Sequence, residues 1–182
     1  MLPPSAIRLP LGYSTLMTSF FRGQPSDIYL DEAKNELWYR FKLSSEAAGP
    51  PGLAHGGFCA AILDEAMGAA VWLQGIKALA GKLEFRYRNP VPLRRVLYVR
   101  AGIIRRSGSR ARARADMFLD EKTVLVSGEG LFVSSPFWNQ QEISQGWDLL
   151  LKLHELREDG MNAQEALRQI SAAKSEFSPD LP

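Results

Sequence analysis

The tripeptide His55-Gly56-Gly57 is the part of the sequence best suited to stabilise a developing oxyanion. It follows the proline- and glycine-rich stretch 47–52 and precedes a long apolar run, so it lies where a helix begins. The first N–H groups of a helix have no acceptor within it, and the positive end of the helix dipole lies behind them. Because Gly56 and Gly57 carry no side chain, a carbonyl group could approach the backbone closely. Such a tripeptide is also compatible with an ordinary tight helix start.

Asp64 is the second group that could do chemistry, because it lies with Glu65 in the otherwise apolar run 60–67. Burying a carboxylate without a partner is strongly unfavourable, so its presence there requires a reason. Adjacent residues differ by about 100° around a helix, so Asp64 and Glu65 cannot both face one site. One of the two is expected to cap, pair or meet water.

Helix geometry separates His55 from Asp64 within one chain. Nine positions along a helix correspond to roughly 13 Å of rise and about 900° of rotation, which leaves the two residues on opposite sides. Two chains packed with antiparallel helices would instead place the helix start of one beside the mid-helix acid of the other. We therefore predict a two-fold dimer with two equivalent sites, each shared between subunits.

Hydrophobic periodicity indicates which elements position these residues. Strands are predicted at residues 28–30, 36–43, 79–87, 96–105, 111–119 and 124–133, and one mostly apolar helix from Phe58 to about Gln74. The first two strands form a hairpin, and the last four are expected to form a meander. A sheet with one apolar face needs a cover, and such a helix needs burial. We therefore expect an α+β fold in which an antiparallel sheet wraps around one long central helix.

The chain is long enough for one full-sized core rather than two, with 182 residues. We divide it into a proline-containing arm at residues 1–26, one domain at 27–136 and a helical extension at 137–182. Within the arm, residues 14–21 could form a short helix or turn. The extension is predicted to form two amphipathic helices, which could cap the sheet, cover a neighbouring subunit or close a pocket, with capping of the sheet preferred. His154 is expected to be an exposed residue of the first of these helices.

Two segments carry a resemblance to a known family. Residues 52–68, with six residues between His55-Gly56-Gly57 and Asp64, and residues 83–93, with a Tyr-x-x-Pro motif, resemble hot-dog-fold thioesterases of the phenylacetate-pathway (PaaI-like) type. The similarity covers roughly residues 27–134. It implies the hot-dog fold, a dimer that often pairs again to a tetramer, and hydrolysis of acyl-CoA. It also implies that neither a metal nor an organic cofactor is needed.

The resemblance assigns roles by position. The N–H of Gly56 would polarise the thioester carbonyl, and Asp64 of the partner chain would act as general base or nucleophile. His55 would support the loop and the thioester. Gly57 and Glu65 are the further candidates for contact with the substrate.

Two positions depart from the pattern of the relatives. Gly49 stands where an Asn is often found six residues before the histidine, and Ala80 stands where a Ser or Thr is common ten residues before the proline. Placement of the attacking water would then rest on Glu65, on backbone groups or on the C-terminal extension. The departures motivate an alternative hypothesis, a non-catalytic protein that binds acyl-CoA or an acyl carrier.

Basic residues are concentrated between Lys82 and Arg114, where eleven of the 22 Lys and Arg residues accompany a single acid, Glu84. Alternating arginines could simply solvate the outer face of an antiparallel sheet, or they could bind a phosphate-rich ligand. With the resemblance in view, the candidates for the CoA phosphates are Arg88, Arg105, Arg106 and Arg110. A formal net charge of +2 and the lack of a recognised motif argue against a nucleic-acid module.

The remaining sequence features concern the hydrophobic core and the cellular location of the protein. Cys59 is the only cysteine and is expected to be a small packing residue. Met67, Trp72 and Leu73 could line an acyl pocket or belong to the core. The sequence has no signal peptide and no apolar run long enough to span a membrane, so we expect a cytoplasmic protein.

Overall fold

The computed structural model describes residues 2–10, 27–134 and 145–176. The short helix or turn predicted at residues 14–21 lies outside this part of the chain. No helix among the described residues has the length and apolar character required to cross a membrane.

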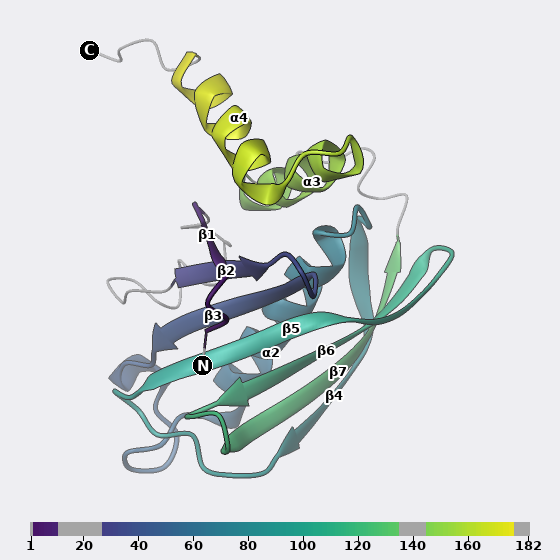
Figure 1. Cartoon of the computed structure of the whole chain (residues 1–182). Coiled ribbons are helices and arrows are strands. Elements are labelled where there is room, and N and C mark those ends of the chain that lie inside the picture. The colour runs from purple at the N-terminus through teal and green to yellow at the C-terminus, as the bar shows by residue number, and fades with distance from the viewer. Residues whose placement is uncertain (1, 11–26, 135–144, 177–182) are drawn as a thin grey trace, which may run out of the picture.

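A seven-stranded antiparallel sheet and one long helix form the body of the molecule (Figure 1). The strands are β1 (Ile7–Leu9), β2 (Asp27–Asp31), β3 (Glu36–Lys42), β4 (Ala78–Tyr87), β5 (Val96–Ser107), β6 (Arg110–Phe118) and β7 (Val124–Ser134). The helices are the short 3-10 helix η1 (Ser45–Ala47), the central α2 (Gly56–Trp72), α3 (Gln145–Glu158) and α4 (Ala163–Glu176). The predicted α+β class, the β2–β3 hairpin and the central helix wrapped by an antiparallel sheet are confirmed.

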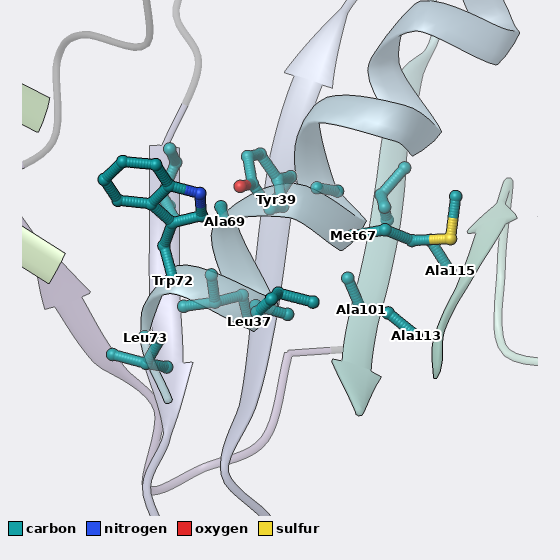
Figure 2. Packing of buried hydrophobic residues seen from close by; sticks show 14 of the residues in the cluster. Leu37, Tyr39, Met67, Ala69, Trp72, Leu73, Ala101, Ala113 and Ala115 are labelled. Carbon is teal, nitrogen blue, oxygen red and sulfur yellow. The ribbon is translucent and has the colours of Figure 1, made fainter. Parts of the chain in front are cut away.

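Helix α2 packs on the inner face of the sheet because both surfaces are apolar. Met67 is fully buried, and the alanines opposite it on β5 and β6 are Ala101, Ala113 and Ala115 (Figure 2). Side chains as small as alanine let the helix axis approach the strands closely, so larger residues from the helix can fill the space between them. The long helix is therefore held rigidly against the centre of the sheet.

The predicted meander of four strands is wrong for β4. The strand order is β1-β2-β3-β5-β6-β7-β4, so β5, β6 and β7 follow one another but β4 lies at the sheet edge beside β7. The segment after β4 contains Pro90 and Pro92 and crosses to β3 instead of turning back. It is tied on its way by hydrogen bonds from the Ala54 N–H to the Val91 carbonyl at 2.8 Å and from the Arg94 N–H to the Leu43 carbonyl at 2.9 Å.

The two C-terminal helices predicted from the sequence are present, and they lie together at one end of the molecule (Figure 1). Arg157 of α3 forms an ion pair with Glu32 in the β2–β3 turn at 3.5 Å, and the N–H of Ala163 donates to the same carboxylate at 2.7 Å. The expectation for His154 is wrong. Its side chain is half-buried because its ring lies directly on Gly75, which has no side chain to obstruct it.

Substitution of Ala113 by Leu tests how tightly α2 and the sheet are packed. Ala113 is completely buried, so three additional carbon atoms must push against the helix. We expect a loss of about 1–3 kcal/mol in the free energy of unfolding, measured by urea denaturation. Arg112→Ala is the control, because Arg112 is the preceding residue of β6 and is exposed on the outer face. An equal loss in both variants would contradict the close packing.

Candidate active site

The helix start at His55 is fixed by the loop before it. The N–H of His55 donates to the Ala47 carbonyl at 2.8 Å, and the N–H of Gly49 donates to the Leu53 carbonyl at 2.9 Å. His55 is the N-cap of α2, and its Nδ1 accepts a hydrogen bond from the Gly57 N–H at 3.0 Å. In a neutral ring this arrangement places the proton on Nε2, so the exposed side chain presents an N–H donor to solvent.

The sequence-based expectation of several free N–H groups at this helix start needs a correction. The Gly57 N–H is occupied by His55, so it is not open to a ligand. The Gly56 N–H, by contrast, has no acceptor within the described residues. Of the two glycines, Gly56 is therefore the one positioned to donate to an oxyanion.

Tyr87, at the end of β4, covers Gly56. Its hydroxyl donates to the Gly56 carbonyl at 2.8 Å, and a Cβ on Gly56 would lie 3.3 Å from the tyrosine ring. From the sequence, Tyr87 is recognisable only as part of the Tyr-x-x-Pro motif and has no assigned role. Nothing in the sequence alone shows that this strand end returns to the helix start, because that contact follows from the position of β4 at the sheet edge.

Asp64 is a half-buried carboxylate in the middle of α2. Burial raises its pKa above the ordinary value of 3.8. Within the described residues no ion pair or hydrogen bond to this carboxylate is present. Eight positions separate Asp64 from Gly56, about 12 Å along the helix axis, so one chain does not bring these two groups together.

Glu65 faces a different neighbour from Asp64, as the helix geometry requires. It lies close to the buried Tyr39 of β3, whose pKa is raised well above its ordinary value first by burial and then by the charge of Glu65. The carboxylate of Glu65 is thus directed toward the sheet. The structure does not bring Glu65 together with the helix start at His55.

The two departures from the family pattern have different surroundings. A Cβ on Gly49 would lie 2.9 Å from Cα and 3.1 Å from N of His55, so this loop has no room for an asparagine side chain there. Ala80 is exposed on β4, opposite Phe132 and beside a β-bulge. Ala80 is near the start of the strand, away from the end that carries Tyr87.

The four arginines proposed for the CoA phosphates fall into two groups. Arg88 follows β4 next to Tyr87, and its Nε donates to Ser127 Oγ at 3.3 Å. It lines a groove on the outer face of the sheet together with Arg86 and Arg114, two residues that were not candidates from the sequence. The other three, Arg105, Arg106 and Arg110, lie at the β5–β6 hairpin, near the opposite end of α2, where Arg106 donates to the Gln74 carbonyl at 3.2 Å.

The remaining sequence candidates belong to the core. Cys59 is buried, and burial raises the pKa of its thiol to about 11, which agrees with a packing role. Met67, Trp72 and Leu73 are also buried. Among the described residues no group of three His, Cys, Asp or Glu side chains is arranged to hold a metal ion.

Comparison with known proteins yields one family and several relatives. The family model of the thioesterase superfamily matches residues 51–126. The chain is 30% identical over 86 residues to acyl-coenzyme A thioesterase THEM4 of Mus musculus, an alignment that covers 47% of this chain and 37% of the mouse protein. The chain therefore spans less than half the length of this relative.

Two solved structures are similar to the hot-dog body. A crystal structure of a thioesterase superfamily protein has a TM-score of 0.57 and 29% identity, covering 60% of this chain and 54% of that one. A single-residue mutant of the phenylacetic acid degradation protein PaaI from Thermus thermophilus has a TM-score of 0.58 and 21% identity, covering 67% of this chain and 100% of that one. The expected hot-dog fold and the PaaI-like resemblance are thereby confirmed.

Replacement of His55 by Ala removes the N-cap of α2. We expect a loss of about 0.5–2 kcal/mol in the free energy of unfolding, measured by urea denaturation. His55→Asn should recover most of this loss, because a side-chain amide oxygen can accept the same N–H. A full loss in both variants would show that the ring acts through something other than its capping hydrogen bond.

Replacement of Asp64 by Asn should stabilise the fold at neutral pH. A carboxyl whose folded pKa is raised favours its neutral form, so its unfavourable contribution grows as pH rises from the ordinary pKa through the folded one. Asp64→Asn should therefore raise the urea midpoint at about pH 7 and leave it nearly unchanged at about pH 3. A gain of equal size at both pH values would refute burial of the charge as its cause.

Proposed function

We propose that the chain, whose residues 51–126 match the family model of the thioesterase superfamily, hydrolyses the thioester of an acyl-CoA to a free acid and CoA. The observation that carries the proposal is Asp64, a half-buried carboxylate with a raised pKa and no ion-pair partner in the described residues, on a helix that is otherwise largely buried. A carboxylate of this kind does not stabilise the fold, whereas it is well suited to act as a general acid or base. The similarity to an acyl-coenzyme A thioesterase supports CoA as the carrier of the acyl group.

We propose that the working unit is a homodimer joined through β4. This strand has ten residues, forms one edge of the sheet and exposes 46% of Leu79 and 54% of Tyr87. An edge of this length and character is a ready surface for pairing with another chain. The opposite edge is the three-residue strand β1, which packs against α4. Further pairing of dimers into a tetramer would use other surfaces.

Pairing of two β4 strands about a two-fold axis would set the two α2 helices antiparallel on the same side of the joined sheet. The middle of one helix would then lie beside the start of the other. Asp64 of one chain and Gly56 of its partner could thus face one thioester from two sides. The dimer would thus bring together two groups that lie about 12 Å apart along the helix axis of a single chain.

The proposed reaction starts when the thioester carbonyl oxygen accepts the Gly56 N–H of one chain. Asp64 of the other chain removes a proton from water, and the hydroxide adds to the carbonyl carbon. The resulting oxyanion is stabilised by the same N–H and by the helix dipole behind it. When the carbon–sulfur bond breaks, the thiolate of CoA takes the proton back from Asp64. In this proposal the Nε2–H of His55 donates to the oxyanion or to the departing sulfur.

Asp64 can alternatively attack the carbonyl carbon itself, which would form a mixed anhydride and release the CoA thiolate before water arrives. Both routes require the ionised carboxylate and the Gly56 N–H. Burial strengthens Asp64 as a base because it raises the pKa of the carboxyl. The loop around Gly49 leaves no room for the asparagine found in relatives, so water placement falls to other groups.

We assign the CoA phosphates to Arg88. It directly follows Tyr87, which contacts Gly56 at the start of its own α2. Arg105, Arg106 and Arg110 lie near the far end of α2, where Arg106 donates to the Gln74 carbonyl, and we leave them out of the phosphate site. The guanidinium group of Arg88 could contact the 3'-phosphate or the diphosphate.

A second candidate function is binding of acyl-CoA or an acyl carrier without hydrolysis. The observation that favours it is the contact between Gly49 and the backbone of His55, which excludes the usual asparagine. Purified protein that binds acyl-CoA esters but releases no thiol from short, long or aromatic esters would support this alternative.

Asp64→Asn tests the catalytic proposal. Loss of the base should reduce the release of CoA thiol from acyl-CoA by about a hundredfold or more, while the variant remains folded and dimeric. Glu155→Gln is the control, because Glu155 is an exposed carboxylate on α3 and should leave the rate unchanged. Wild-type turnover in Asp64→Asn would remove Asp64 from the mechanism.

A further inference from the structure

Trp147, near the start of α3, lies on the surface of α2 at a glycine. A Cβ on Gly68 would lie 3.4 Å from Cη2 of Trp147 and 3.8 Å from Cε1 of Phe132 on β7. The indole also contacts Trp72, with ring centroids 4.9 Å apart and planes tilted by 52°. The Trp147 ring therefore occupies the space that a larger residue at position 68 would fill.

This contact lies directly beyond the proposed catalytic carboxylate. Gly68 is four residues after Asp64, about 6 Å along the helix axis and about 40° around it, so the two positions share one face of α2. Phe132 and Trp147 meet at the same point and make an apolar surface there. Consider a thioester whose carbonyl lies beside Asp64 and whose acyl group extends toward the end of α2. This acyl group meets the Trp147 ring after one helical turn.

We propose that Trp147 is the end wall of the acyl pocket and limits the length of the acyl group that this chain accepts. The inference rests on the proposed thioesterase function. The apolar end of the site takes the acyl group, since the polar end holds His55, the Gly56 N–H and the arginine beside Tyr87. Short and flat acyl groups fit between Asp64 and the indole, whereas long straight chains collide with it.

The wall is held in place by the rest of α3. The ring of His154 lies so close to Gly75 that a Cβ there would overlap it, and Arg157 is paired with Glu32 at 3.5 Å and donates to Asn35 at 3.0 Å. These contacts fix α3 along its length, so the indole cannot swing aside without breaking them. Helix α3 lies outside the residues that the family model matches, and the selectivity is thus a feature of the C-terminal extension.

The test compares kcat/KM for straight-chain acyl-CoA esters from acetyl to palmitoyl. Wild-type protein should favour the short esters, and Trp147→Ala should increase the long-to-short ratio of kcat/KM by about tenfold or more. Gly68→Ala should shift the ratio the other way, because the added methyl group narrows the space beside an intact ring. Trp147→Phe, with a smaller ring in the same place, should lie between wild type and Trp147→Ala.

Glu155→Gln is the matched control, because Glu155 is an exposed carboxylate on α3 and its replacement leaves the indole, Gly68 and the anchor of α3 unchanged. It should keep the wild-type chain-length profile. Suppose that the wild type hydrolyses acyl-CoA, and that Trp147→Ala and Gly68→Ala both keep its dependence of kcat/KM on acyl length. The role of Trp147 as an end wall is then refuted, and the proposed function stands. A shift in Glu155→Gln as large as that in Trp147→Ala would also refute it. If the wild type hydrolyses none of the esters, the proposed function fails first and the inference fails with it.

Should Trp147→Ala fail to fold, as judged by circular dichroism, Trp147→Phe and Gly68→Ala still decide the question. Both keep a ring against α2, and they are expected to move the chain-length profile in opposite directions. Unchanged profiles in these two folded variants would overturn the proposal.

Discussion

Burial of α2 against the alanine-lined face of the sheet is the constraint on which the rest of the structure depends. The helix is apolar nearly all round, and Ala101, Ala113 and Ala115 allow it to approach β5 and β6 closely. A helix held this way has no freedom to rotate or slide. Its start at His55 and its middle at Asp64 therefore keep fixed positions relative to the sheet edge, as a site built on rigid elements requires.

The same burial distinguishes two kinds of carboxylate in this protein. Asp116 is only 3% exposed, and Arg100 and Arg114 pair with it at 3.4 and 3.1 Å, so its charge is compensated and its role is structural. Asp64 is less buried but has no such pair among the described residues, and burial raises its pKa. A carboxylate that makes the folded state less stable without compensation is best explained by function.

The sequence predicted most of the fold because its elements differ in periodicity. The apolar run after His55 has no breaker except Gly68, and the alternation along β3 and β6 defines their inner faces, so helix and strands could be located within about two residues. The place of β4 could not be predicted, since periodicity does not tell which strands pair. For the same reason the contact of Tyr87 with Gly56 was missed. The occupation of the Gly57 N–H by His55 depends on a side-chain rotamer that no spacing reveals.

The proposed role of Trp147 would let the C-terminal extension set the selectivity of the site without a change in its chemistry. Gly68 and Gly75 each lack the side chain that would keep α3 away, and Gly75 also has a φ of +72°, a conformation that glycine adopts without strain. Helix α3 therefore fits onto the end of α2 as part of the core. A displacement of the whole helix would expose Leu150 and Leu153, which are buried, and would separate Arg157 from Glu32. The size of the side chain at position 147 can change with far less disturbance, so the acyl preference of this fold can vary there while α2 and its carboxylate stay in place.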